Sequence, residues 1–137
     1  MESTVVEVRV RYAETDQMGR AHHAHHLVWC EAARTAWLRE RGASYAEMEE
    51  RGVLLPVSRV EVDYRRPARY DETVRVETWL EGVRSRSVTF RYALSRRSDG
   101  TLLAEAETDL VCVDEEERIR RIPDDLRTLL EEGAVGA

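Results

Sequence analysis

One long segment with helical character, set among short stretches with strand character, constrains the fold of this chain more than any other feature. The residues from about His23 to Arg41 contain neither glycine nor proline, and Gly42 follows them. This composition predicts a long helix that ends at the glycine. Apolar side chains recur along it at helical spacing over a wide face, which predicts burial on several sides. These apolar residues are Leu27, Trp29, Cys30, Ala33, Ala36 and Trp37.

Before and after this segment, apolar residues alternate with polar ones, which is typical of half-buried strands. The alternating sets run from Val6 to Tyr12, Val60 to Tyr64, Val74 to Thr78, Val88 to Leu94 and Leu102 to Cys112. Asp99-Gly100 predicts a hairpin between the last two strands. One strand, a long helix and then four strands in series predict an α+β fold with an antiparallel sheet, not alternating βαβ units.

Two shorter helices are also predicted. The first runs from Ser44 to Arg51, where Ser44 is the N-cap, Glu47 completes a capping box and Gly52 ends the helix. The second runs from Pro123 to Glu132, with the proline at or near its first turn.

Composition limits the class of protein. The 137 residues predict a single domain, 1–137, and the net charge of −6 argues against a general nucleic-acid binder. Two cysteines, Cys30 and Cys112, do not make a disulfide framework. No signal peptide is visible, and the apolar runs are too short to span a bilayer. We therefore expect a soluble, cytoplasmic protein with no membrane partner.

Some large apolar residues fall on the polar faces of their strands. Trp79, Val111 and Val113 are of this kind. Cover by a second subunit would explain them, so we expect an oligomer.

Between the first strand and the long helix lies the segment that concentrates groups able to do chemistry. Asp16 is a candidate general base or nucleophile for an acyl carbon, although a turn or capping aspartate is the simpler explanation of its position. Gly19 lets the backbone approach a ligand closely. The backbone N–H groups near His23 and Ala24, at the start of the helix, are candidates to stabilise a developing oxyanion.

Four histidines in this segment raise a second possibility, a metal site. His22 lies three and four residues before His25 and His26, a spacing that places pairs on one helical face. Zinc usually needs a third protein ligand, for which Asp16 or Glu31 is the nearest candidate. No His-Glu-x-x-His pattern is present, so a metal-dependent hydrolase is only an alternative. Another alternative is that Cys30 and His26 form a nucleophilic pair, although the helical spacing of Cys30 favours a position in the hydrophobic core.

Arginines cluster at two places. Arg65, Arg66 and Arg69 surround Pro67, and Arg84 and Arg86 flank Ser85. Such groups can bind the phosphates of a nucleotide-bearing substrate, while solvated ion pairs are the default in a chain so rich in arginine.

Taken together, these motifs resemble a known family. The pattern Tyr12-x-Glu14-Thr15-Asp16-x-Met18-Gly19, then His23, then Glu31-Ala-Ala-Arg34-Thr, resembles the hotdog-fold acyl-CoA thioesterases. The likeness is greatest to the 4-hydroxybenzoyl-CoA thioesterase-like branch, which includes the Tol–Pal-associated enzymes. The segments Tyr64-x-x-Pro67-Ala68-x-x-Asp71 and Val111-Cys-Val-Asp114 extend it over nearly the whole chain.

The resemblance implies a long central helix wrapped by a five- or six-stranded antiparallel sheet, in homodimers or homotetramers joined by sheet edges. It implies hydrolysis of acyl-CoA to free acid and CoA without a cofactor, at a site between two subunits. Asp16 would be the catalytic carboxylate, and the helix start near His23 and Ala24 would polarise the carbonyl. Candidates for substrate contact are His26, Arg65, Arg66, Pro67, Arg84, Ser85 and Arg86.

The chain departs from the family pattern at His26, where an aromatic hydroxyl residue is frequent, and at His22, where a tyrosine is frequent. The acyl preference is therefore open. A non-catalytic hotdog protein that binds acyl-CoA or lipid is the main alternative. A metal-dependent hydrolase that uses the cluster from His22 to His26 is a weaker one, and a hotdog dehydratase resembles the chain less well.

Overall fold

The computed structural model describes residues 2–134 as three α-helices, one short 3-10 helix and five strands. In chain order the elements are β1 (Ser3–Arg9), η1 (Tyr12–Glu14), α1 (His25–Glu40), α2 (Tyr45–Glu50), β2 (Val57–Tyr64), β3 (Thr73–Val83), β4 (Ser87–Arg96), β5 (Leu102–Val111) and α3 (Asp124–Gly133). None of the helices in this part of the chain has the length and apolar character needed to cross a membrane.

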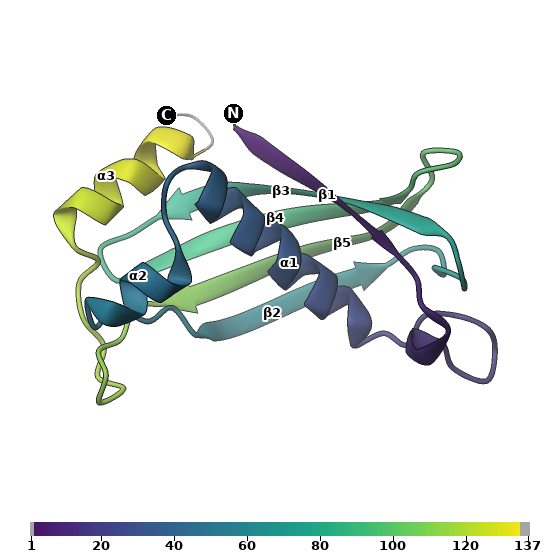
Figure 1. Ribbon diagram of the computed structural model, residues 1–137, viewed down its shortest axis with the longest axis horizontal. Helices are drawn as coiled ribbons and strands as arrows, with labels where there is room; N and C mark the ends of the chain where they lie inside the picture. The colour runs from purple at the N-terminus through teal and green to yellow at the C-terminus, as the bar shows by residue number, and fades with distance from the viewer. Residues whose placement is uncertain (1, 135–137) are drawn as a thin grey trace.

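All five strands form one antiparallel sheet in the order β1-β3-β4-β5-β2. The long helix α1 runs diagonally across one face of this sheet (Figure 1). The α+β class and the five-stranded antiparallel sheet around a long helix are therefore confirmed. The Asp99-Gly100 hairpin is confirmed as well, with Gly100 at a φ of +75° that suits a residue without a Cβ.

The core lies between α1 and the face of the sheet that the alternating residues predict. Trp37 meets Phe90 of β4 edge to face, with ring centroids 5.4 Å apart. The buried side chains of α1 are those of His26, Trp29, Cys30, Ala33, Arg34, Trp37 and Leu38. Those of the three central strands include Val74, Val76, Leu80, Val88, Tyr92, Leu94, Ala106 and Leu110.

Several local predictions are wrong for identifiable reasons. The first strand ends at Arg9, so Tyr12 starts η1 and is exposed. In β5 the register shifts so that Leu94 pairs with Ala104 and Ser95 with Leu102, which buries the extra residue, Leu103, and exposes Leu102. Val113 is buried by its own chain, between bridges to Leu54 and Ile119, and gives no argument for a second subunit.

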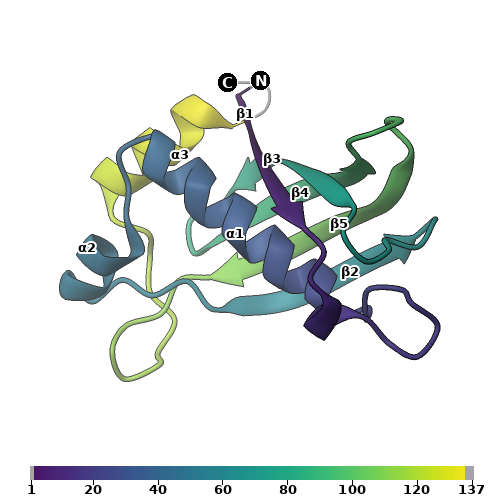
Figure 2. The same ribbon diagram turned by 45° about the vertical axis from the view of Figure 1, so that its right-hand side comes forward.

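The short helices follow their predicted caps, with one difference. Ser44 accepts a hydrogen bond from the Glu47 amide at 3.2 Å, as an N-cap should. The Glu47 side chain makes no return bond to Ser44, so the capping box is not formed. At the other end of the chain, α3 lies beside the C-terminal end of α1 and adds Leu126 and Leu130 to the core (Figure 2).

The helix covers the sheet unevenly. It packs mainly against β1 and β3, whereas β2, at the opposite edge, is exposed at every position except the half-buried Val62. Val57, Val60 and Tyr64 stay exposed although they lie on the helix side of the sheet. Leu27 and Val28, on the first half of α1, are exposed too, which corrects the prediction that Leu27 is buried.

A buried carboxylate fixes how the chain passes from β1 into α1. Glu14 is 4% exposed and accepts hydrogen bonds from the Arg11 amide at 2.7 Å and from Trp29 Nε1 at 3.3 Å. Its Oε2 atom also lies 3.8 Å from His25 Nδ1. Burial raises the pKa of Glu14, but hydrogen bonds from Arg11 and Trp29 outweigh burial and hold it below the ordinary value of 4.5.

We expect Glu14→Gln to lower the free energy of unfolding by about 1–3 kcal/mol at pH 7, because one of these buried donors loses its acceptor. Since the folded-state pKa of Glu14 is depressed, this stabilisation is fully present above pH 4.5 and is lost as the pH falls further. Chemical denaturation of both proteins between pH 7 and pH 3 measures it. Glu50→Gln, at an exposed position of α2, is the control. An equal effect of the two substitutions at pH 7 contradicts the role of Glu14.

Candidate active site

Asp16 lies in a tight loop whose backbone is closed on both sides. Thr15 and Ala21 form a bridge, and the Asp16 amide donates to the Arg20 carbonyl at 2.8 Å. Gly19, at a φ of +78°, completes the turn by donating to the Asp16 carbonyl. The Ala21 amide then donates to the Ala68 carbonyl at 2.7 Å, which attaches the loop to the segment that follows β2.

The two carboxylate oxygens of Asp16 have different surroundings. Oδ1 accepts hydrogen bonds from the amides of Met18 at 2.8 Å and Arg20 at 3.3 Å. These two hydrogen bonds are what is expected of an aspartate that stabilises a turn, the simpler explanation of its position. Oδ2 has no hydrogen-bond partner among residues 2–134, so the loop fixes the carboxylate and leaves one oxygen free for other chemistry.

The start of α1 is attached to the end of β2. The His23 carbonyl accepts a hydrogen bond from the Tyr64 hydroxyl at 2.8 Å. Of the two backbone donors that the sequence singles out, the Ala24 amide donates to His22 Nδ1 at 3.3 Å. The His23 amide has no acceptor in the described part of the chain. His23 is therefore the stronger candidate for an oxyanion donor.

Asp16 and His23 line one pocket of about 260 Å³. Its wall brings together six of the predicted site residues, Asp16, His23, His26, Arg65, Arg66 and Pro67. Gly19 shapes the loop without lining the pocket, and Ala24 lies one residue beyond the wall at the helix start. Arg20, Ala21, Tyr64 and Ala68 complete the pocket. The pocket thus brings together a carboxylate, a residue with a free backbone amide, and arginines. Such a set is suited to a substrate in which a reactive carbonyl group is attached to a negatively charged carrier.

The four histidines do not converge on one point. His22 stacks on His23 with ring centroids 4.2 Å apart, and His25 faces Glu14. His26 is buried against Trp29 and Tyr64, and burial lowers its pKa. Between residues 2 and 134, no three His, Cys, Asp or Glu side chains are placed to hold a metal ion. The geometry therefore gives the metal alternative no support.

Cys30 is a core residue, as its helical spacing predicts. It is 1% exposed, and burial raises the pKa of its thiol to about 12. At neutral pH the side chain is therefore protonated, and a nucleophilic pair with His26 has no thiolate to use.

Arg84, Ser85 and Arg86 lie elsewhere. They form the hairpin between β3 and β4, and the Ser85 and Arg86 carbonyls accept bonds from Ile122 and Cys112. None of the three lines the Asp16 pocket. Within one chain the structure does not bring this arginine cluster to Asp16.

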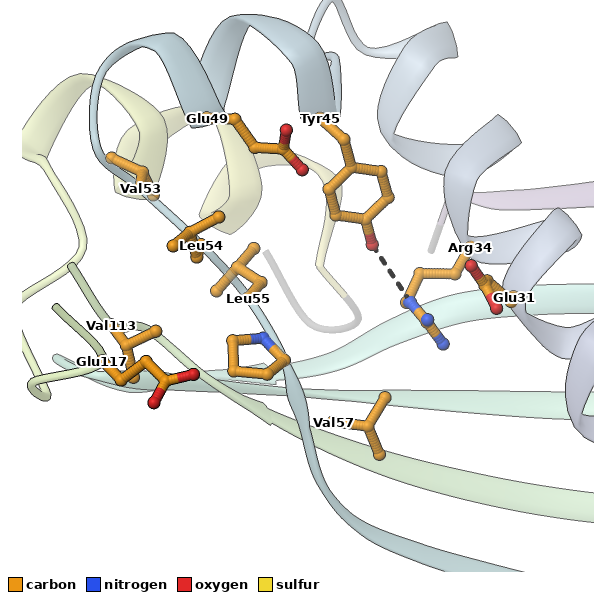
Figure 3. Close-up of a pocket in the computed structure, with 11 residues that line it drawn as sticks. Glu31, Arg34, Tyr45, Glu49, Val53, Leu54, Leu55, Val57, Val113 and Glu117 are labelled. Atoms are coloured by element: carbon orange, nitrogen blue, oxygen red, sulfur yellow. Dashed lines mark hydrogen bonds between the residues drawn. The ribbon is translucent and has the colours of Figure 1, made fainter. Parts of the chain in front are cut away.

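A larger pocket, of about 760 Å³, opens at the other end of β2 (Figure 3). The apolar run from Val53 to Val57 and the side chain of Val113 form one part of it. Arg34 from α1 and Tyr45 from α2 point toward each other across another part, joined by a hydrogen bond of 3.1 Å. Glu31, Glu49 and Glu117 complete the wall.

Sequence reasoning missed three of these groups as site residues. In the sequence, Glu14 and Tyr64 stand out only as parts of motifs. Their roles depend on contacts with segments that are distant in the sequence. The position of Arg34 could have been recognised as unusual from the sequence, because it lies one helical turn after Cys30, on the side of the helix that is predicted to be buried. A charged residue at such a position is unusual and marks a place to examine.

Comparisons with known proteins agree with this geometry. Residues 10–130 match the family model of the thioesterase-like superfamily. The chain is 42% identical over 110 residues to a putative acyl-CoA thioesterase, YneP, of Bacillus subtilis, covering 80% of this chain and 79% of the relative. It is 36% identical over 107 residues to the acyl-CoA thioester hydrolase YbgC of Escherichia coli O6:H1, covering 78% of this chain and 79% of the relative.

Among solved structures, a DHNA-CoA thioesterase from Staphylococcus aureus superposes with a TM-score of 0.91 at 30% identity, over 96% of this chain and 91% of the other. A hypothetical protein, TT1821, from Thermus thermophilus superposes with a TM-score of 0.90 at 42% identity, over 97% of this chain and 98% of the other. The predicted hotdog fold is thereby confirmed. With its family model matched over most of its length, this chain belongs to the thioesterase-like superfamily.

Proposed function

We propose that this protein hydrolyses acyl-CoA thioesters to a free acid and CoA. The observation that carries the proposal is the free Oδ2 atom of Asp16, held by its own loop in a pocket lined also by His23, whose amide is unpaired, and by three arginines. The names of YneP and YbgC, a putative acyl-CoA thioesterase and an acyl-CoA thioester hydrolase, support the same substrate class.

In the proposed reaction, Asp16 Oδ2 either takes a proton from an attacking water or attacks the acyl carbon itself. Negative charge that develops on the thioester oxygen is stabilised by the His23 amide, at the positive end of the helix dipole. The C–S bond then breaks and the CoA thiolate leaves and takes a proton. Direct attack forms an acyl–Asp16 anhydride, which water must hydrolyse. A thioester is reactive enough for this without a metal ion.

We further propose that the working unit contains two copies of the chain joined through β2. The free edge of β2 is long, and its residues Val57, Val60 and Tyr64 are exposed. An unpaired edge next to an uncovered apolar strip is a ready site for a second sheet. The second copy of the same edge fits it, because two antiparallel β2 strands related by a two-fold axis present the same surface to each other.

This arrangement completes the site. In an antiparallel β2 pair, the first residue of one strand lies near the last residue of the other, so Val57 approaches Tyr64 of the partner subunit. The large pocket of one subunit then adjoins the Asp16 pocket of its partner. Arg84, Ser85 and Arg86 lie near the Val57 end of the sheet, because Ser87 pairs with Val111 there. We propose that they contact the CoA phosphates of a substrate that reacts at the partner's Asp16.

The test of Asp16 is the Asp16→Asn variant. Asparagine keeps an Oδ1 atom for the Met18 and Arg20 amides, so the loop should stay folded while the basic oxygen is lost. We expect turnover to fall by at least about 100-fold, with no effect of a chelator on the native enzyme. Release of free CoA from short, long and aromatic acyl-CoAs measures it.

Asp124→Asn, at the exposed start of α3, is the matched control and should keep full activity. Native-like turnover by Asp16→Asn contradicts the catalytic role. Binding of acyl-CoA by the native protein without any release of CoA supports the non-catalytic alternative, and loss of activity with chelator supports the metal-dependent one.

The test of the β2 interface is Val60→Lys. A lysine on this edge should prevent strand pairing, so the variant should have the mass of one chain and lose most of its activity. Val5→Lys is the control, because Val5 lies on the other edge strand and is 39% exposed against 42% for Val60. Light scattering coupled to size exclusion gives the mass. A fully active native monomer contradicts the proposed interface.

A further inference from the structure

The large pocket contains a buried cation that no carboxylate contacts directly. Arg34 is 7% exposed, and no Asp or Glu oxygen of the described residues lies within 4 Å of its guanidinium. Instead, Nε donates to the Tyr45 hydroxyl at 3.1 Å and Nη1 to the Tyr92 hydroxyl at 3.0 Å. A buried charge without a counter-ion is costly, so its retention in a pocket points to a ligand.

The guanidinium is also fixed in place. Tyr92 shares a further hydrogen bond of 2.6 Å with Thr108, so the network joins α1, α2, β4 and β5. Burial lowers the pKa of Arg34, but the contacts with Tyr92 and Tyr45 outweigh burial and raise it, so the group stays charged. Nη2 makes no hydrogen bond within residues 2–134. Both N–H groups of Nη2, on one arm of a rigid fork, are therefore left for a molecule in the pocket.

The charge of the wall decides what kind of group fits. Arg34 is its one cation, whereas Glu31, Glu49 and Glu117 are three acids, so the pocket is negative as a whole. An anionic group would meet repulsion from the acids. A neutral oxygen that accepts a hydrogen bond gains from Arg34 without that cost.

The position of the pocket decides which end of a substrate reaches it. The Asp16 pocket and the large pocket share no residue, and Tyr64 and Val57 mark their positions at opposite ends of β2. Seven residue steps along a strand span about 23 Å. The Asp16 that serves the large pocket is therefore that of the partner subunit, whose Tyr64 end adjoins Val57 in the proposed dimer.

We propose that Arg34 determines acyl specificity: it selects acyl groups with a neutral oxygen, such as a hydroxyl, at the end distant from the thioester. The acyl chain runs from the partner's Asp16 past Val57 along the apolar strip, and its terminal oxygen accepts a hydrogen bond from Arg34. This inference rests on the proposed thioesterase function and on the proposed dimer.

The experiment compares acyl-CoAs in pairs of equal chain length that end in a methyl or a hydroxyl group, with a carboxylate-ended member at each length. We expect the native enzyme to have a higher kcat/KM for the hydroxyl-ended member of at least one pair. Arg34→Met should reduce that preference, measured as the ratio of kcat/KM for the hydroxyl-ended and methyl-ended members, by about tenfold, because a charged hydrogen bond is lost.

Tyr45→Phe is the second variant, because it removes only the hydroxyl that orients Nε, and it should weaken the preference if Arg34→Met fails to fold. Arg39→Met, at an exposed position of α1, is the control and should not change it. Equal rates for methyl- and hydroxyl-ended members, or a preference for the carboxylate, overturn the inference while leaving the thioesterase function intact. No CoA release from any member overturns both.

Discussion

One helix is too narrow to cover a five-stranded sheet, and much of this structure follows from that mismatch. An α-helix with its side chains is about 10–12 Å wide, whereas five strands spaced about 4.8 Å apart present a face roughly twice as wide. Here α1 lies over β1 and β3, and β2 stays exposed with Val57, Val60 and Tyr64 on the uncovered strip. The sheet therefore has an edge strand, β2, that is neither paired on its outer side nor covered by the helix. Both pockets open along this strand.

Polar contacts hold the groups at both ends of that edge in place. Glu14 joins η1 to α1, and the Tyr64 hydroxyl holds the His23 carbonyl at the end of β2. These bonds fix the Asp16 loop between two rigid elements, so in the proposed reaction the carboxylate would need little rearrangement to meet a substrate. At the other end, Tyr45 and Tyr92 hold Arg34 in the same manner. Two prepositioned groups of opposite charge thus mark the two ends of one strand.

The sequence predicted what depends on local pattern. Period and turn chemistry predicted the α+β class, the five strands and the long helix, and the Asp16 motif with its arginines predicted six residues of one pocket. It could not predict what depends on register or on distant contacts. The bulge that buries Leu103 instead of Leu102 leaves no local signature, and Leu27 looks like a core residue because periodicity does not show how far a sheet extends. The roles of Tyr64 and Arg34 emerge only when separate elements meet.

The central claim is that one catalytic centre uses Asp16 of one subunit and the large pocket of the other. Subunit complementation tests it most directly. Asp16→Asn and Leu54→Trp, which fills the large pocket, should each be inactive alone. After subunit exchange, half of the dimers are hybrids with one intact site each, so the mixture should recover about one quarter of native activity. If Asp16 and the pocket of the same chain work together, both sites of a hybrid carry a lesion, and a mixture that stays inactive despite exchange contradicts the account.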